Sequence, residues 1–299
     1  MTKASPNPLV AESPLKEAWG VFRRSGLALF GLGLLITIII VSLIGPLIYT
    51  VDPIEIIWAP LTAPGMEAVV PLGTDYLGRD MLAGLINGGK ATLAVGISAA
   101  LITVIIGISI GAMAGYYGGQ ALGGRFPYHP FPKLRVTEFF QVLPPLLFAM
   151  VLVTLFSPTL PIVAVAIGVV SWPATARLAR AEFIRIRNLE YVNAARSISA
   201  TDNWIIWRVI LPNALPPLIV SSTLSIGIAI LFEAGLSFLG LSDPNIVSWG
   251  LMIGSGRQYI LDAWWVVTLP GVMIFLTVLS VSLVGDGLND AFNPKLRDR

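Results

Sequence analysis

Residues 191–217 read YVNAARSISATDNWIIWRVILPNALPP and interrupt a chain that is otherwise strongly apolar. The stretch brings three charged residues, Arg196, Asp202 and Arg208, together with several polar groups between two apolar regions. It also contains an Ala-Ala pair, a turn-like Ser-Ala-Thr-Asp and a Leu-Pro step. Charged residues are costly inside the hydrocarbon of a bilayer, so the stretch belongs in a water-facing loop between two membrane spans.

The composition of the whole chain favours a polytopic membrane protein. Of its 299 residues, 55% are hydrophobic and 12% are charged, and the mean hydropathy is +0.80. A soluble domain has about a quarter of its residues charged. The chain has no cysteine, which excludes disulfides, thiolate catalysis and Cys-ligated metal sites. The apolar segments recur from Leu27 almost to the C-terminus and predict one membrane domain.

Segments with few or no charges predict an all-α membrane protein with six transmembrane helices. Each segment reaches the roughly 17–25 residues that cross the hydrocarbon core. The third and fourth would form one overlong helix without a break, and residues 157–161, Ser-Pro-Thr-Leu-Pro, supply that break. The first span comes too late for a cleaved signal peptide. The predicted spans are 27–49, 91–117, 139–156, 159–176, 213–232 and 263–285.

The basic residues predict the orientation of these spans. If the N-terminus lies inside, only Arg79, Lys90 and Arg257 of the 19 Lys and Arg residues lie outside, and the other 16 lie inside. Both termini are therefore expected in the cytoplasm. The predicted organisation is a cytoplasmic segment 1–26, a membrane domain 27–285 with a charged cytoplasmic loop 177–211, and a cytoplasmic tail 286–299.

Two features of the outer side invite a functional interpretation. Residues 84–91, GLINGGKA, have the spacing of a phosphate-binding loop, but Ala91 stands where such a loop needs Ser or Thr for magnesium, and no strand precedes it. The larger stretch 77–92 predicts a short helix at the outer interface. Glu233, at the outer end of the fifth span, is a candidate by default. We favour an interfacial position for it, solvated or capping a loop.

The opening stretch predicts a helix–turn–helix. Residues at the three-to-four spacing of one helix side are Leu189, Val192 and Ala195, with Tyr191 and Ala194 beside them. A turn at 199–202 follows, with Thr201 or Asp202 as the N-cap of the next helix. That helix, 204–210, leads back to the membrane, and Pro212 marks the start of the fifth span. An ordinary amphipathic loop that covers the inner end of the bundle is the alternative.

Residues 193–212 resemble the cytoplasmic loop of ABC-importer permeases, whose pattern is Glu-Ala-Ala, three residues, Gly, nine residues, Ile, one residue, Leu-Pro. The aligned residues are Asn193, Ala194, Ala195, Ser199, Val209, Leu211 and Pro212. Asn193 departs from the family's Glu and Ser199 from its Gly. The stretches that look like the dipeptide/oligopeptide/nickel subfamily, in the permease that ends in a Gly-Asp-Gly-Leu-x-Asp run, are 71–96, 233–253 and 283–297.

The resemblance implies a type I importer permease fold in the bacterial inner membrane. A second related permease would complete the path, two cytoplasmic ABC ATPase subunits would use ATP and Mg, and an extracytoplasmic binding protein would deliver the solute. This chain would not be an enzyme and would bind no cofactor, metal or nucleic acid. Loop 185–211 would couple the spans to the ATPases. The residues implied in coupling are Glu190, Asn193, Ala194, Ala195, Arg196, Ser199, Ala200, Asp202, Leu211 and Pro212.

Within that loop, the charged residues that can form a switchable polar rim toward the ATPase are Arg185, Arg187, Glu190, Arg196 and Asp202. Asn193 cannot make the charge-assisted bonds of a Glu. At Ser199, either the turn needs no positive φ or serine adopts one at some cost. We expect Ser199→Gly to be tolerated and Ser199→Trp to uncouple transport from ATP hydrolysis.

Two other functional classes remain as alternatives. A secondary transporter or channel would show inverted repeats and ionisable groups near the bilayer midplane. An intramembrane enzyme would need a nucleophile or a metal set within a span. The sequence shows neither pattern. The cargo is peptide-like by frequency among similar systems, with oligopeptides, nickel chelates and other solutes as alternatives, and the residues that line the path are not readable from the sequence.

Overall fold

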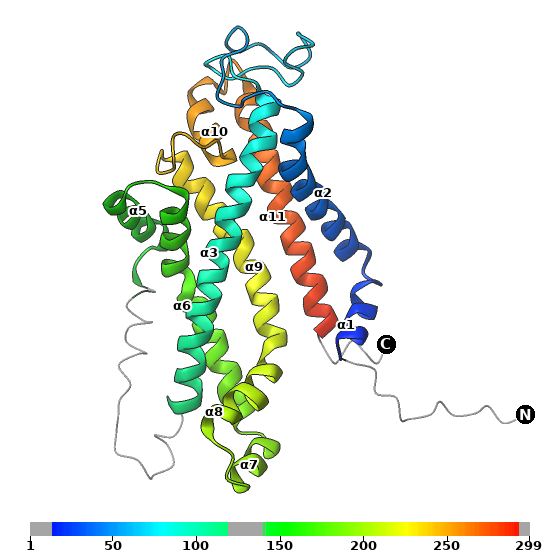
Figure 1. The fold of residues 1–299 in the computed structure, drawn as a ribbon, viewed down its shortest axis with the longest axis vertical. Coiled ribbons are helices and arrows are strands. Elements are labelled where there is room, and N and C mark those ends of the chain that lie inside the picture. The colour runs from blue at the N-terminus through cyan, green and yellow to red at the C-terminus, as the bar shows by residue number, and fades with distance from the viewer. Residues whose placement is uncertain (1–13, 119–139, 141, 293–299) are drawn as a thin grey trace, which may run out of the picture.

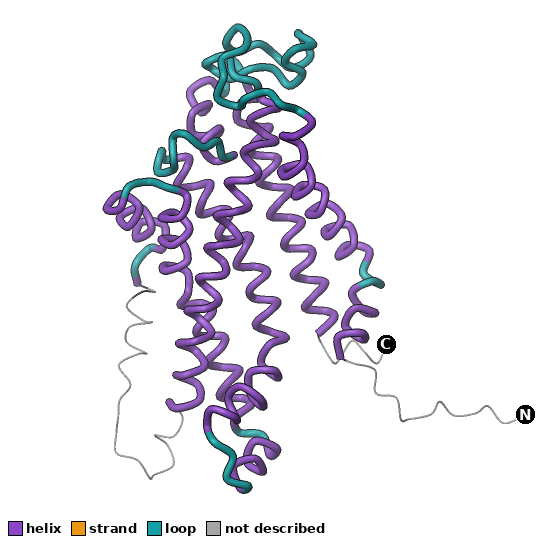
Figure 2. The backbone as a smooth tube through the Cα atoms, in the orientation of Figure 1, coloured by secondary structure: helices purple, strands orange, loops and turns teal. Residues whose placement is uncertain are grey.

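A computed structural model of the chain describes residues 14–118, 140 and 142–292. These residues form an all-helical fold without a strand (Figures 1 and 2). The elements in chain order are α1 (Pro14–Phe22), α2 (Gly26–Ile48), α3 (Met81–Gly118), α5 (Pro145–Phe156), α6 (Leu160–Arg187), α7 (Glu190–Ser197), α8 (Asp202–Trp204), the π-helix η2 (Ile205–Ile210), α9 (Leu211–Phe238), α10 (Trp249–Gly256), the 3-10 helix η3 (Arg257–Tyr259) and α11 (Trp264–Phe292).

Five helices of the described chain are long and apolar enough to cross a membrane. They are α2, α3, α6, the continuous helix Asp202–Phe238 and α11. The helix expected at 139–156 is shorter, because α5 begins at Pro145 and has 12 residues, about 18 Å of helix. The stretch 119–139 lies outside the described residues. A six-span topology with both termini inside therefore stays a prediction.

The break predicted at 157–161 is confirmed. Helix α5 ends at Phe156, Ser157 takes a φ of +73°, and α6 begins at Leu160. Pro161 lies in the first turn of α6, where its missing N–H is no loss. Val153 and Val163 are buried in the same apolar cluster, so the two helices pack as a hairpin.

Four spans extend well beyond the predicted boundaries, including α11, which runs to Phe292 instead of ending at residue 285. The separate interfacial helix predicted at 77–92 is wrong, because these residues include the first turns of the 38-residue α3. Asp80 starts α3 by accepting a hydrogen bond from the Leu82 N–H (2.8 Å), and no proline interrupts the helix after it. At the other end of the bundle, α6 continues to Arg187 and the fifth span begins ten residues before Pro212.

Helices α3 and α6 pack against each other along most of their length. Three glycines of α3 at four-residue spacing face α6. A Cβ at Gly107 would lie 2.6 Å from the Thr175 Cβ, and one at Gly115 would lie 2.6 Å from the Phe183 Cβ. Gly111 similarly meets the backbone of Ala176. Small residues at this spacing let two helix backbones approach closely, so α3 and α6 form one tightly packed unit.

The end of the bundle that the sequence predicts to face outward, which we call the outer end, is covered by loop 49–80 and by α10, which Figure 1 shows at the top. The Trp249 indole donates to the Leu85 carbonyl (2.8 Å), and the Trp265 indole donates to the Thr74 carbonyl (3.1 Å). The Tyr49 hydroxyl donates to the Asp80 carboxylate. Burial, together with this bond to a carboxylate, raises the pKa of Tyr49 to about 12. The outer loop is thus held by side chains of its own chain.

Candidate functional site

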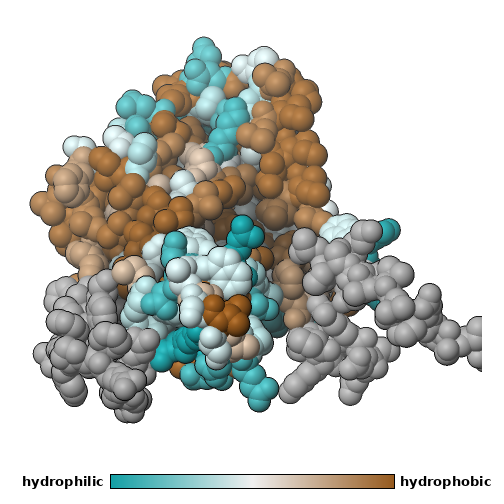
Figure 3. Space-filling model, turned by 60° about the horizontal axis from the view of Figure 1, so that its bottom comes forward, coloured by the Kyte–Doolittle hydropathy of each residue, from teal (hydrophilic) through white to brown (hydrophobic). Residues whose placement is uncertain are grey.

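The predicted helix–turn–helix lies at the end of the molecule opposite loop 49–80 (Figure 1). Helix α7 ends at Ser197, and Thr201 caps the helix that starts at Asp202, accepting from the Trp204 N–H at 3.4 Å. This confirms the first of the two N-cap candidates. In Figure 3 this end of the described chain is largely hydrophilic, whereas the flanks of the bundle are hydrophobic. The segment projects as a polar tip from an apolar bundle.

One face of α7 packs onto the bundle. Val192 is fully buried and Ala195 is 9% exposed, in a cluster with Phe183, Ile205 and Ile210. The buried face is narrower than the spacing predicted, because Leu189, Tyr191 and Ala194 are exposed. The α7 backbone is therefore fixed from below while much of its surface stays available.

The outward face of this segment combines polar and apolar side chains. Among the coupling residues implied by the sequence, those exposed are Glu190, Asn193, Ala194, Ser199, Asp202 and Pro212. Sequence reasoning missed Ile198, which is 78% exposed at the turn. Tyr191, Leu189 and Trp204 are also exposed. Four large apolar side chains on one short polar tip form a contact surface, and the signal in the sequence was an isoleucine between two turn serines.

The turn itself explains the glycine of the family pattern. Ser199 adopts a φ of +61°. The Ser199 N–H donates to the Arg196 carbonyl (2.9 Å), and the Ala200 N–H donates to the Ala195 carbonyl (3.2 Å). This is a Schellman ending, in which the residue with positive φ is usually glycine. Of the two possibilities at Ser199, the structure therefore selects a serine held in the left-handed region.

Three of the five predicted rim charges turn toward α3 instead of outward. The Tyr116 hydroxyl donates to Asp202 Oδ1 at 2.5 Å, and the Arg196 guanidinium lies 5.7 Å from the centre of the Tyr116 ring. Arg187 donates to the Tyr116 carbonyl at the end of α3. Arg185 instead pairs with Glu182 on its own helix. Of the predicted rim charges, Arg185 and Glu190 are exposed without a contact to α3.

The Leu-Pro step lies in a distorted part of the helix. Residues 205–210 form a π-helix, in which the Leu211 N–H donates to the Ile206 carbonyl. Pro212 has no N–H and its ring crowds the carbonyl of Arg208, which accounts for the wider turn. Pro216 and Pro217 follow inside α9. The root of α9 is therefore poor in helical hydrogen bonds.

A cavity of about 560 Å³ opens between α3, α5, α6 and α9. Its volume is within the range of about 300–1,000 Å³ typical of small-molecule sites. Pro173 lines it and interrupts α6, which leaves the Val169 carbonyl without its helical partner. The Oγ of Ser171 also has no hydrogen-bond partner among the described residues. The polar side chains in its lining are Thr103, Ser171, Thr175, Arg177, Ser221 and Ser225.

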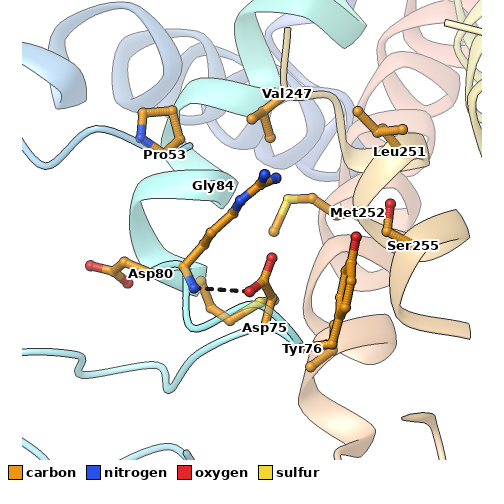
Figure 4. Close-up of a pocket in the computed structure, with 12 residues that line it drawn as sticks. Pro53, Asp75, Tyr76, Asp80, Gly84, Val247, Leu251, Met252 and Ser255 are labelled. Carbon is orange, nitrogen blue, oxygen red and sulfur yellow. Dashed lines mark hydrogen bonds between the residues drawn. The ribbon is translucent and has the colours of Figure 1, made fainter. Parts of the chain in front are cut away.

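A second pocket lies under the outer loop, where Figure 4 shows Asp75, Tyr76 and Met252 around it. Asp75 Oδ1 accepts from the Arg79 N–H (2.9 Å), the dashed line in Figure 4. The free space is about 50 Å³, room for a few water molecules. This pocket is too small to be a solute site. Its acidic residues, Asp75 and Asp80, accept hydrogen bonds from backbone N–H groups of residues 77–82.

Glu233 is buried, so the predicted solvated position is wrong. Its side chain is fully inaccessible at the contact of α9 with α3 and α10. Oε1 accepts from the Ser237 hydroxyl (2.7 Å), and Oε2 has no hydrogen-bond partner among the described residues. Thr92 and Ser248 are buried polar residues of the neighbouring α3 and the α10 N-cap. The helix packing of the outer half, which the sequence does not show, encloses the carboxyl group.

Comparison with known proteins gives consistent matches. Residues 131–298 match a family described as binding-protein-dependent transport system inner membrane component, and residues 13–64 match the N-terminal TM domain of oligopeptide transport permease C. The "Di/tripeptide transport system permease protein DppC" of Pseudomonas aeruginosa (strain UCBPP-PA14) is 40% identical, over 99% of this chain and 97% of the relative. The "Dipeptide transport system permease protein DppC" of Haemophilus influenzae is 34% identical, over 98% of this chain and 99% of the relative.

The fold also matches a solved structure. A chain of the MetNI methionine ABC transporter in an inward facing conformation superposes with a TM-score of 0.57 and 21% identity, covering 71% of this chain and 98% of that chain. At this identity the likeness concerns the fold alone. It confirms the type I importer permease fold that the sequence predicted.

Proposed function

The chain belongs to the family of binding-protein-dependent transport system inner membrane components, and from this premise we propose that it forms half of the path of an ATP-driven importer of short peptides. Membership confirms the predicted resemblance to importer permeases and a multi-pass position in the bacterial inner membrane. The names of its relatives favour di- and tripeptides as cargo.

The proposed partners are a second related permease, two cytoplasmic ABC ATPases that use ATP and Mg, and an extracytoplasmic binding protein. ATP hydrolysis is assigned to the partners because residues 84–91 are part of α3 and not a phosphate-binding loop. Gly88 and Gly89 pack against Trp249, where a Cβ at Gly88 would lie 2.9 Å from Trp249 Cδ1. Such glycines serve helix packing.

The observation that carries the proposal is the exposed tip at residues 189–204. Its apolar side chains Tyr191 and Ile198 reach into water on a backbone that is fixed by Val192 and Ala195. A transporter that worked alone would have no use for such a surface on its polar end. We assign Glu190, Asn193, Ala194, Ser199 and Ile198 to direct ATPase contact. Ala195, Ala200 and Leu211, which are less exposed, support the turn from inside.

We assign the 560 Å³ cavity to this chain's share of the path. The hydroxyls of Ser171, Ser221 and Ser225, which line the cavity, can exchange hydrogen bonds with peptide amides. Arg177, near the inner end of α6, offers a cation to a peptide carboxylate. The remaining apolar wall suits side chains of varied shape.

Transport by the reconstituted complex tests the proposal. Proteoliposomes would contain this chain, the second permease and the ATPases, with the binding protein outside and ATP inside. We expect uptake of a labelled dipeptide that stops without ATP. Uptake by the permeases alone would contradict an ATP-driven mechanism and favour a secondary transporter.

A substitution in the cavity tests its assignment separately. Ser225→Trp places a large ring in the cavity and should reduce peptide uptake about tenfold while the complex still assembles and hydrolyses ATP. Ser222→Trp, on the same helix but outside the lining, is the matched control. Normal uptake by Ser225→Trp would remove the cavity from the path.

A further inference from the structure

The inner end of α3 is tied to the coupling segment by a buried tyrosine. Tyr116 is fully buried two residues before the end of α3. Its hydroxyl donates to Asp202 Oδ1 at 2.5 Å, across 86 residues of sequence. A hydrogen bond of this length to a carboxylate is of the strong, charge-assisted kind. Asp202 follows directly after Thr201, the N-cap that closes the turn.

Two arginines complete this attachment. Arg196, near the end of α7, lies over the Tyr116 ring at 5.7 Å from its centroid. Arg187, the last residue of α6, donates to the Tyr116 carbonyl and, at 3.4 Å, to the Gly115 carbonyl. These carbonyls belong to the last described turn of α3. The end of α3 thus contacts α6, α7 and the start of the helix at Asp202.

We propose that Tyr116 is a positioning residue that couples the ATPase-contacting turn to α3, so that α3 carries the movement of the turn to the outer helix α10. The proposal rests on the proposed function, in which the turn contacts an ATPase. It adds a specific route from that contact to the outer side of the membrane. We call the contacts of Tyr116 with Asp202 and Arg196 the α3 anchor.

Helix α3 is suited to carry a displacement. Its 38 residues span about 57 Å without a proline. Gly107, Gly111 and Gly115 hold it against α6 at close range, so the two helices move together. At the outer end, Leu85 and Thr92 accept hydrogen bonds from the indole (2.8 Å) and backbone (3.4 Å) N–H groups of Trp249 in α10. A shift of α3 therefore reaches α10 through direct contacts.

The direct continuation of the turn into α9 is a weaker route. Residues 205–210 form a π-helix, and Pro212, Pro216 and Pro217 remove three helical hydrogen-bond donors in the next turns. A helix segment with these features bends more easily than a regular one. Movement of the turn would be absorbed there in part, whereas the α3 anchor transmits it to an uninterrupted helix.

The test compares Tyr116→Phe with Tyr117→Phe in the full complex in proteoliposomes. Tyr117 is the adjacent tyrosine, 37% exposed, and its ring packs edge-on against Tyr116. The readouts are ATP hydrolysed and labelled dipeptide imported. For Tyr116→Phe we expect the import per ATP to fall about tenfold, because one charge-assisted hydrogen bond is lost. ATPase docking and hydrolysis should stay, and Tyr117→Phe should behave as the unmodified chain.

Two further variants separate the α3 anchor from other roles of Asp202. They are Asp202→Asn and the double variant that combines it with Tyr116→Phe. If Asp202 acts through Tyr116, the double variant is no worse than Tyr116→Phe; if it acts on the ATPase alone, the two effects multiply and the proposal is overturned. Should Tyr116→Phe assemble poorly, Asp202→Ala decides, because it removes the acceptor of the Tyr116 hydroxyl at a surface position. Unchanged coupling in Asp202→Ala overturns the anchor.

The natural chain has no cysteine, which allows a direct measurement of the outer end. A dye at Leu261→Cys, at an outer position that is 95% exposed, should report an ATP-dependent change that Tyr116→Phe abolishes. An unchanged dye response in Tyr116→Phe would contradict transmission through α3. Absence of ATP-dependent import in the unmodified complex would instead contradict the proposed function.

Discussion

The two ends of the molecule are held in different ways. At the outer end, side chains of the chain bond its own loop, as Trp265 does with the Thr74 carbonyl and Asp75 with the Leu77 N–H. At the inner end, the turn after α7 exposes Ile198 and holds Ser199 at a positive φ. In the outer loop, glycine occupies three of the four positions with positive φ, and Leu61 (φ +54°) is the fourth. At one of these glycines, Gly73, a Cβ would overlap the Thr62 carbonyl. The outer loop is thus held by bonds within the chain, whereas the inner turn carries an exposed isoleucine and a serine at positive φ.

The largest effect is expected from a substitution of a buried tryptophan at the outer end. Trp249 is fully buried and its indole donates to Leu85. We expect Trp249→Ala to lower the stability of the domain by about 3–5 kcal/mol, because it creates a cavity and removes the hydrogen bond of the indole to the Leu85 carbonyl. Thermal unfolding of the purified complex measures this. A change below about 1 kcal/mol would mean that the outer end is not held by this contact.

The inner end should respond in the opposite manner to Ile198→Asp. Stability should hardly change, because the side chain is 78% exposed. Affinity for the ATPases should fall about 10–30-fold, since an apolar contact is replaced by a charge. Co-purification and titration of the ATPases measure it. Ser197→Asp, an equal charge beside it on α7, is the control, and equal losses for both variants would contradict a specific apolar contact.

Substitutions at Ser199 test the positive φ of the inner turn and its role in coupling. Ser199→Gly should stabilise the turn by about 0.5–1 kcal/mol, because glycine adopts a φ of +61° without steric cost. Transport should persist. Ser199→Trp combines the same backbone strain with a large ring at the contact surface, and should uncouple ATP hydrolysis from peptide import. Unchanged coupling in Ser199→Trp would remove the turn from the ATPase contact.

The smallest expected effect concerns Tyr49. Its pKa is raised from 10.0 to about 12, mainly by burial, so the neutral phenol is favoured in the folded protein. The resulting stability is fully present below pH 10 and is lost as the pH rises through 12. Thermal unfolding over this window should show a slightly steeper loss for the unmodified chain than for Tyr49→Phe. Parallel curves would contradict the hydrogen bond of the Tyr49 hydroxyl to Asp80.

Much of the fold was predictable because it depends on local patterns. Long apolar segments, the Ser-Pro-Thr-Leu-Pro break and Thr201 as an N-cap follow from composition, backbone stereochemistry and short-range hydrogen bonds, and the structure bears them out. The start of α3 was missed because charges at Arg79 and Lys90 suggested a boundary, whereas the helix continues through Lys90. The length of an apolar segment and its flanking charges predict where the chain enters the membrane. A helix can begin well before that point, as α3 does at Met81.

The candidate site was likewise predicted only in part from the sequence. The family resemblance placed Asn193, Ala194 and Ser199 in the coupling segment. It missed the exposure of Ile198, since exposure depends on which face of α7 packs onto the bundle. The residues that line the path were not predictable either. Their cavity is formed by four helices whose polar side chains are scattered along the sequence.

By itself, the sequence determined an all-helical membrane domain, its break points and a helix–turn–helix on a polar loop, because these features are set by residues within a few positions of one another. Only the tertiary structure decided that Asp202 and Arg196 face Tyr116 and that Glu233 is enclosed between helices. These side chains meet partners far away in the chain. Their direction is set by the close packing of α3, α6 and α9, and no local pattern records that packing.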